Sequence, residues 1–311
     1  MKALVTGGAG FIGSNLVHAL LARGDEVRVL DDLCTGYREN VPPEVELIIG
    51  SVANEGALGA AVAGVEVVFH EAARRSVIGS LEHPLRTDTA NVYGTLAVLE
   101  LARQAGVRRV ISASSSSVYG GAAQMPTPET APLVPRSPYA VSKLSAEHYC
   151  RVYAELHGLE TVSLRYFNVY GPRQRPDSAY AAVIPLFIEA LENRKPPTVH
   201  GDGLQSRDFT FVADAVAANL GAATASREAC SGNAYNVAGG HRYSLLELLD
   251  LLGGILDVDP VPEFTEPRPG DVRASEADIS AAANDLGYRP SVGFAEGLAR
   301  TVDWFLHRRS G

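Results

Sequence analysis

The chain has 311 residues, of which 46% are hydrophobic and 20% charged, and its formal net charge is −9. This composition is typical of a globular protein, and without a basic tract it argues against nucleic acid as a partner. Cys34, Cys150 and Cys230 lie far apart, with neither metal-ligand spacing nor the even number of a disulfide framework. No run of about 18 apolar residues occurs and Met1 leads directly into a strand-like run, so we expect no membrane span, no signal peptide and a cytoplasmic protein.

The N-terminal segment has the order of a dinucleotide-binding unit. An apolar run, Ala3–Thr6, precedes the glycine-rich stretch Gly7–Gly13, and Ser14–Arg23 has helical periodicity. Strand, glycine turn and helix in this order let a pyrophosphate approach the backbone amides at the helix N-terminus. The sequence therefore predicts a site for a dinucleotide.

The next predicted strand, Glu26–Leu30, ends in Asp31 and Asp32. An acidic side chain at this position can accept hydrogen bonds from both hydroxyls of an adenosine ribose and repels a 2′-phosphate. The pattern favours NAD over NADP, with a solvated loop acid as the alternative interpretation.

Further strand-like runs alternate with helical sequence, which predicts an α/β fold with a doubly wound parallel sheet, the Rossmann arrangement. The runs are 45–49, 65–69 and 109–113, and the helix expected over 91–105 ends at Gly106. Ligands of such sheets bind beyond the carboxyl ends of the strands. We expect the glycine loop, Asp31, the stretch 70–73 and the serine run 114–117 to converge there.

Tyr139 and Lys143 stand four residues apart at the start of a predicted helix that runs to His157. They share one helix face, and Pro138 is tolerated in a first turn. A tyrosine with a pKa of about 10 needs roughly 4 kcal/mol of differential stabilisation to act as a base near pH 7. A neighbouring ammonium and a nicotinamide cation can supply it. The alternative is a tyrosine that only packs.

After the strand expected at 161–165, proline, glycine and arginine cluster, and the texture indicates a second, smaller α/β substrate lobe. Its arginines could bind a diphosphate or form surface salt bridges. We expect residues 1–167, with a return segment near 208–256, to form the NAD-binding domain, and 168–207 with 257–311 to form the substrate lobe. Ser244 is expected to cap a leucine-rich helix. The arginines concerned are Arg165, Arg173, Arg175, Arg207 and Arg268.

Eight ordered motifs along nearly the whole chain resemble the extended short-chain dehydrogenase/reductase family, and within it the NAD-dependent UDP-sugar 4-epimerases similar to UDP-galactose 4-epimerase. The motifs are Thr6–Gly13, Leu30–Gly36, Asn91–Thr95, Ser114–Gly120, Tyr139–Lys143, Leu164–Arg173, Gly201–Phe209 and Arg268–Asp271.

The resemblance implies roles for individual residues. Tyr139 resembles the catalytic base, Lys143 its partner, which also holds the nicotinamide ribose, and Ser115 the hydroxyl that bonds the sugar 4-oxygen. Asn168, Arg207 and Arg268 resemble the diphosphate ligands, Asp271 the uridine-ribose acceptor, and Val199 with His200 the uracil-contacting strand. The implied cofactor site comprises Gly7, Gly10, Phe11, Ile12, Asp31, Asp32, Val52, Ala72, Ala73, Asn91, Tyr139, Lys143 and Tyr166. The implied substrate site comprises Arg75, Ser115, Ser117, Asn168, Arg175, Val183, Val199, His200, Gln205, Arg207, Arg268 and Asp271.

The chain also departs from the family pattern. Ser51 stands where an adenine-contacting Asp is usual, Glu71 replaces an apolar residue, and Arg75 is an unusual charge near the nicotinamide end. Arg175 resembles the arginine that faces the sugar carboxylate in glucuronate 4-epimerases, and Ser275 stands where a bulky Tyr restricts some members to small sugars. Asn168 and the stretch 181–185 instead resemble members that act on neutral hexoses.

The resemblance implies transient oxidation at C4 of a UDP-linked hexose or hexuronic acid, with a tightly bound NAD that is recycled. The sugar pairs left open are glucuronate/galacturonate, glucose/galactose and the N-acetyl pair. A dehydratase or decarboxylase on the same scaffold would need an acid and a base where Ser116 and Ser117 stand. A catalytically silent NAD-binding sensor is the third alternative. A homodimer through the helices 91–105 and 139–157 is also implied.

Overall fold

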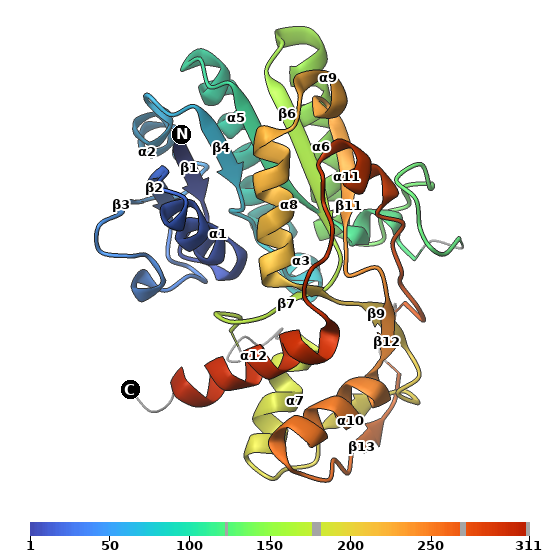
Figure 1. The fold of residues 1–311 in the computed structure, drawn as a ribbon. Helices are drawn as coiled ribbons and strands as arrows, with labels where there is room; N and C mark the ends of the chain where they lie inside the picture. The colour runs from blue at the N-terminus through green and yellow to red at the C-terminus, as the bar shows by residue number, and fades with distance from the viewer. Residues whose placement is uncertain (122–123, 176–181, 268–271, 309–311) are drawn as a thin grey trace.

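The computed structural model describes residues 1–121, 124–175, 182–267 and 272–308. Its centre is a parallel seven-stranded sheet in the order β11-β6-β5-β4-β1-β2-β3 (Figure 1). This confirms the predicted doubly wound α/β sheet. The strands are β1 (Lys2–Thr6), β2 (Glu26–Asp31), β3 (Glu46–Ile49), β4 (Val67–His70), β5 (Arg109–Ser115), β6 (Glu160–Tyr166) and β11 (Asn233–Val237).

Helices cover both faces of the sheet because its central strands are apolar on both sides. In β1, Ala3 and Val5 face one hydrophobic cluster and Leu4 faces the other. The first face is covered by α1 (Phe11–Ala22), α8 (Val212–Thr224) and α11 (Ser280–Asp285), and the second by α2 (Glu55–Val62), α5 (Gly94–Gln104) and α6 (Pro138–His157). The short helices α3 (Val77–Glu82), α4 (Pro84–Asp88) and the π-turn η2 (Thr89–Tyr93) lead into α5.

Helix α6 begins and ends where its sequence predicts. The Ser137 hydroxyl accepts a hydrogen bond from the Ala140 amide at 3.1 Å, Pro138 occupies the first turn, and Gly158 ends the helix at φ +68°. Tyr139 and Lys143 therefore lie on the inward face of the first turn and a half, and both are buried.

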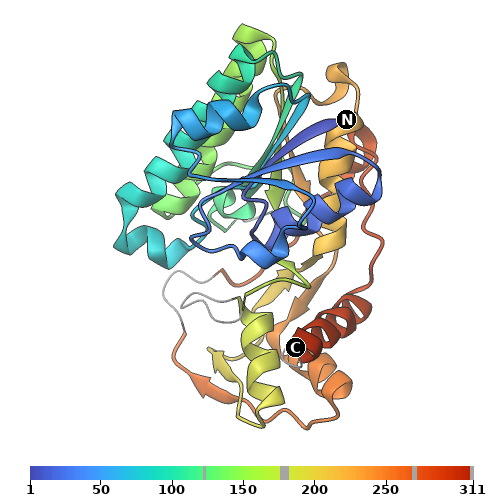
Figure 2. The same cartoon turned by 90° about the vertical axis from the view of Figure 1, so that its left-hand side faces the viewer.

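A second lobe lies beyond the carboxyl ends of the sheet strands (Figures 1 and 2). Its core joins α7 (Val183–Glu192), α10 (Leu245–Leu256) and α12 (Phe294–Arg308), with Phe294 stacked on Tyr243 at 4.2 Å between ring centroids. The paired strands β8 (Thr198–His200) and β13 (Glu263–Thr265) border it. The remaining short elements are β7 (Val169–Tyr170), β9 (Ser206–Asp208), β10 (Thr210–Phe211), β12 (Arg242–Ser244), α9 (Arg227–Cys230), η1 (Arg38–Asn40) and η3 (Ser116–Tyr119).

Two helices pack in a different lobe from the one that the expected domain boundaries gave them. Helix α10, which falls in the expected return segment, packs on α7 and α12 of the second lobe, because its leucine stripe finds its apolar partners there. Helix α11, expected in the substrate lobe, packs beside β11. Ser244 caps α10 with a full capping box, as predicted. Within the described residues, no helix is both long and apolar enough to cross a membrane.

Candidate active site

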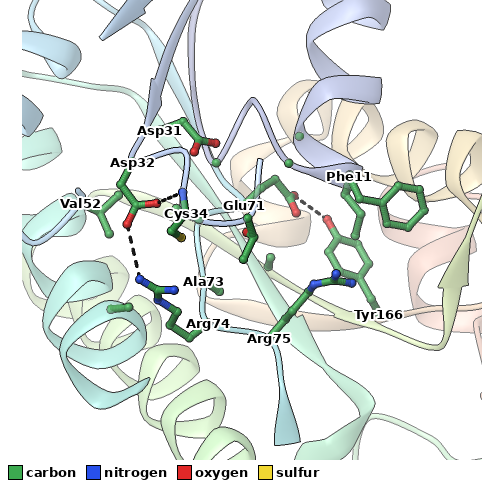
Figure 3. Close-up of a pocket in the computed structure, with 18 of the residues that line it drawn as sticks. Phe11, Asp31, Asp32, Cys34, Val52, Glu71, Ala73, Arg74, Arg75 and Tyr166 are labelled. Atoms are coloured by element: carbon green, nitrogen blue, oxygen red, sulfur yellow. Dashed lines mark hydrogen bonds and ion pairs between the residues drawn. The ribbon is translucent and has the colours of Figure 1, made fainter. Parts of the chain in front are cut away.

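A cavity opens at the carboxyl ends of β1, β2, β4, β5 and β6, at the edge that faces the second lobe. Most of the implied cofactor residues and several of the implied substrate residues line it (Figure 3). These are Gly7, Gly10, Phe11, Ile12, Asp31, Asp32, Val52, Ala72, Ala73, Arg75, Ser115, Tyr139, Lys143, Tyr166, Asn168 and Arg175.

The glycine loop is shaped for close backbone approach. Gly7 has φ +72°, and a Cβ there would lie 2.6 Å from the backbone nitrogen of Ala72. A Cβ on Gly13 would collide with the carbonyl oxygen of Gly7. Gly10 is the N-cap of α1 and provides no side-chain cap, so the first-turn amides are directed toward the cavity for an anion. These features fit the pyrophosphate of a dinucleotide.

Asp31 is the last residue of β2, and its carboxylate holds the glycine loop through a hydrogen bond to the loop backbone. Its two carboxylate oxygens accept hydrogen bonds from the Ala9 amide at 2.9 Å and the Leu33 amide at 2.8 Å. Burial raises the pKa of Asp31, while these amides favour its ionised form. Asp32 pairs with Arg74 at 3.7 Å. Carboxylate oxygens keep further lone pairs, so this corner fits the two hydroxyls of an adenosine ribose.

The tyrosine and the lysine meet Ser115 at the same end of the cavity. The Ser115 side chain acts on the Tyr139 hydroxyl and favours a lower pKa for it, and the Tyr139 backbone amide donates to the Ser80 hydroxyl at 3.1 Å. The Lys143 ammonium donates to the Ala113 carbonyl at 2.7 Å. Ser115 stands at the end of β5 and caps η3, so strand, turn and helix together fix all three side chains.

Burial dominates the proton affinities of this cluster. It raises the pKa of Tyr139, against the Ser115 hydrogen bond and the charge of Arg75. It lowers the pKa of Lys143 to about 8, against the charge of Glu71. Tyr139 is therefore neutral until additional positive charge reaches it, and a cationic nicotinamide ring would supply such charge. The residues present fit a nicotinamide dinucleotide.

A second cavity lies in the second lobe and shares Asn168 with the first. Val183, His200, Gln205 and Arg207 also line it. The Asn168 amide donates to the Asp208 carbonyl at 2.9 Å, and its φ of +35° turns the chain between the lobes. Val183, His200, Gln205 and Arg207, which the resemblance implies as substrate residues, thus lie together in a cavity that meets the first one at Asn168.

Three of the implied residues do not line either cavity. Val199 is fully buried in the core of the second lobe, because β8 alternates and turns this side chain inward. The Ser117 hydroxyl is buried and has no hydrogen-bond partner among the described residues. Asn91 supports the loop instead, since its amide bonds both backbone groups of Arg74 at 2.8 and 3.0 Å. Arg268 and Asp271 lie outside the described residues.

Of the four arginines of the expected phosphate set that the structure describes, Arg165 is the buried one. Its guanidinium pairs with Glu147 at 2.7 Å, and both side chains are buried. Arg165 therefore forms a salt bridge rather than a phosphate contact, and the salt bridge is buried instead of lying on the surface as the alternative expected. Arg175 reaches across the cavity mouth, where it donates to the Thr35 carbonyl at 3.0 Å and lies 4.5 Å from the Tyr37 ring centroid.

The sequence interpretation missed Asn219 on α8. Its amide donates to the Tyr166 hydroxyl at 2.7 Å, and that hydroxyl donates to Glu71 at 2.7 Å. An asparagine on the buried face of an alanine-rich helix is the signal that could have identified it. Arg74, the partner of Asp32, was missed as well.

The family model described as "NAD dependent epimerase/dehydratase family" matches residues 3–238. The chain belongs to this family. It is 41% identical to a UDP-glucose 4-epimerase of Mycolicibacterium smegmatis, with 99% of each chain covered. The family confirms the predicted resemblance and an enzyme that depends on NAD.

Solved structures agree with this assignment. The UDP-glucose 4-epimerase of Thermotoga maritima, determined with UDP-glucose, superposes with a TM-score of 0.95 at 37% identity, covering 99% of this chain and 100% of that one. The UDP-glucuronic acid 4-epimerase of Bacillus cereus, determined with UDP-glucuronic acid and NAD, gives a TM-score of 0.91 at 33% identity and covers 99% and 100%.

Proposed function

We propose that this protein is an isomerase that inverts C4 of a UDP-linked hexose or hexuronic acid. The observation that carries the proposal is that Tyr139, Lys143 and Ser115 line the cavity that also holds the glycine loop. A base at this point can act on a sugar hydroxyl while a dinucleotide reacts with the same carbon.

Each side chain has one task in the proposed reaction. Tyr139 takes the proton of the C4 hydroxyl and later returns one, while the Ser115 hydroxyl holds the C4 oxygen. The positive charge of Lys143 favours the ionised form of Tyr139. When bound, NAD supplies the capacity to accept a hydride and give it back.

Inversion requires that the keto sugar turns while its nucleotide stays bound. The second cavity, with Asn168, Gln205 and Arg207, supports a remote anchor for a diphosphate and a base. Such anchoring makes the return step effectively intramolecular, because the sugar cannot diffuse away between the two hydride transfers.

Arg75 and Arg175 favour a uronic acid as the substrate sugar, whereas the small Ser275 favours a neutral or larger sugar. Arg75 and Arg175 both line the first cavity and are close enough to disfavour each other's charge, which an anion between them would relieve. Ser275 lies 3.5 Å from the Asn168 amide and leaves room that a bulky side chain would fill. We propose glucuronate/galacturonate and glucose/galactose as the leading pairs and the N-acetyl pair as the third.

Proton NMR of the anomeric signals tests the reaction. The purified protein is incubated with UDP-glucose and, separately, with UDP-glucuronate, without added NAD. Formation of the 4-epimer of either supports the proposal, and the Tyr139→Phe variant serves as the control. If neither is converted, with or without NAD, the UDP-N-acetylhexosamines are tested next, and failure with these as well would reject the proposal in favour of a silent sensor. A 4-keto-6-deoxy product would reject it in favour of a dehydratase, and a pentose product in favour of a decarboxylase.

We also propose the homodimer that the family resemblance implied. Helix α6 exposes Val141, Val152 and Leu156, and the adjoining segment exposes Leu81 and Leu85. Exposed apolar side chains gathered on neighbouring helices support a protein interface. Light scattering that gives a monomer mass at micromolar concentration would contradict the dimer.

A further inference from the structure

Glu71 is a half-buried carboxylate that the proposed reaction does not use. It follows β4 and lines the first cavity, and its carboxylate accepts a hydrogen bond from the Tyr166 hydroxyl at 2.7 Å (Figure 3). Tyr166 ends β6, and its hydroxyl in turn accepts a hydrogen bond from the Asn219 amide at 2.7 Å. The three side chains form one chain of hydrogen bonds at the floor of the cavity.

The direction of these hydrogen bonds is compatible with an ionised Glu71: burial raises the pKa of its carboxyl, while the hydrogen bond from Tyr166 and the charge of Lys143 oppose this rise. The Asn219 nitrogen also donates to the Ala215 carbonyl at 3.0 Å, and a carbonyl can only accept. This fixes the amide orientation, so Asn219 donates to Tyr166 and the phenolic hydrogen is left for Glu71. The carboxylate needs no proton of its own to make this bond.

The surroundings of Glu71 are rich in positive charge. Glu71 and the Lys143 ammonium stabilise each other electrostatically, and Arg75 and Arg175 line the same cavity. Among the described lining residues the other carboxylates are Asp31, at the end of β2, and Asp32, directly after it, at the ribose corner. Glu71 is thus the described carboxylate at the Tyr139 end.

The reacting ring of a dinucleotide has to lie near Tyr139. In the proposed reaction the proton leaves the oxygen, and the hydride leaves the carbon, of one C–O–H group. The oxidised nicotinamide ring is a cation and the reduced ring is neutral, so a nearby ammonium disfavours the oxidised form and a carboxylate favours it.

We propose that Glu71 offsets the positive charge of Lys143 and thereby favours the oxidised over the reduced form of the bound dinucleotide. The inference rests on the proposed dinucleotide site and does not depend on the sugar. Its consequence is an enzyme that returns each hydride rather than remaining in the reduced form.

A competition experiment tests the charge separately from the hydrogen bond. The protein is equilibrated with an excess of NAD⁺ and NADH in equal amounts and desalted, and the bound ratio is measured from the absorbance of NADH. Glu71→Gln removes the charge and keeps an acceptor for Tyr166, whereas Tyr166→Phe removes the hydrogen bond and keeps the charge.

We expect Glu71→Gln to raise the bound NADH-to-NAD⁺ ratio by about tenfold. Tyr166→Phe should change it by less than about twofold, and Lys143→Met, which removes the opposing charge, should lower it. An unchanged ratio in Glu71→Gln, an equal rise in Tyr166→Phe, or a rise in Lys143→Met would each overturn the proposal. The experiment contains no sugar, so the bound ratio can be measured even if the protein epimerises no sugar. Failure of the Glu71 proposal can therefore be distinguished from failure of the proposed function.

Discussion

The buried ammonium of Lys143 should lower the free energy of unfolding of the protein. Its side chain is 6% exposed, and burial lowers its pKa to about 8, while an unfolded chain has the ordinary value of 10.5. The difference corresponds to roughly 3 kcal/mol against the charged form in the folded protein. Lys143→Met removes this cost and loses the hydrogen bond to the Ala113 carbonyl, worth about 1 kcal/mol. The variant should therefore be about 2 kcal/mol more stable than the wild type at pH 7, and inactive.

The pH dependence has a definite sign. Below pH 8 the lysine is protonated in both states, so the full cost is present at neutral pH. Between about pH 8 and 10.5 the folded protein binds fewer protons than the unfolded chain, and the wild type gains stability relative to Lys143→Met. The stability gap should close over this interval. Activity should fall over the same interval, because the ammonium that assists Tyr139 is lost.

Urea denaturation followed by circular dichroism measures the gap, with cofactor removed from both proteins because a ligand would add its own stabilisation. The matched control is Lys195→Met, an exposed lysine for which we expect a change within about 0.5 kcal/mol. A Lys143→Met protein that is less stable than the wild type at pH 7, or a gap that does not narrow above pH 8, would refute the reasoning.

Three other changes have distinct expected results. Tyr139→Phe should lower kcat by about a thousandfold without loss of NAD binding, measured by NMR turnover and calorimetry. Arg175→Ala should reduce kcat/KM selectively for a uronic acid substrate, and equal losses on UDP-glucose and UDP-glucuronate would contradict that role. Glu147→Gln leaves the buried Arg165 charge unpaired and should lower the free energy of unfolding by about 3–5 kcal/mol, whereas Glu155→Gln, on the exposed end of the same helix, should change it little.

Local signals were sufficient for the sheet and for the helix of the tyrosine. Strands alternate with helices at short range, and Ser137, Pro138 and Gly158 define α6 by rules that involve only neighbouring residues. The glycine loop could be predicted for the same reason, because Gly7 and Gly13 have to meet within one turn.

The features that the sequence could not predict depend on contacts between residues far apart in the chain. An arginine is a residue type that often binds phosphate, and only the fold shows that Glu147 of α6 pairs with Arg165 instead. The leucine stripe of α10 indicates that one face of the helix is buried, but it does not indicate which lobe that face packs against. The inward turn of Val199 depends on the register of a three-residue strand, which is too short to show alternation by itself.

The path of the chain between the lobes affects how the protein can fold during synthesis. Six strands of the large sheet are complete at Tyr166, yet the seventh, β11, is translated only after the first segment of the second lobe. Helix α12 comes last and contributes Phe294, Leu298 and Phe305 to the core of that lobe. The nucleotide-binding sheet can therefore begin to form on the ribosome, while the substrate lobe must wait for the C-terminal helix to leave the exit tunnel.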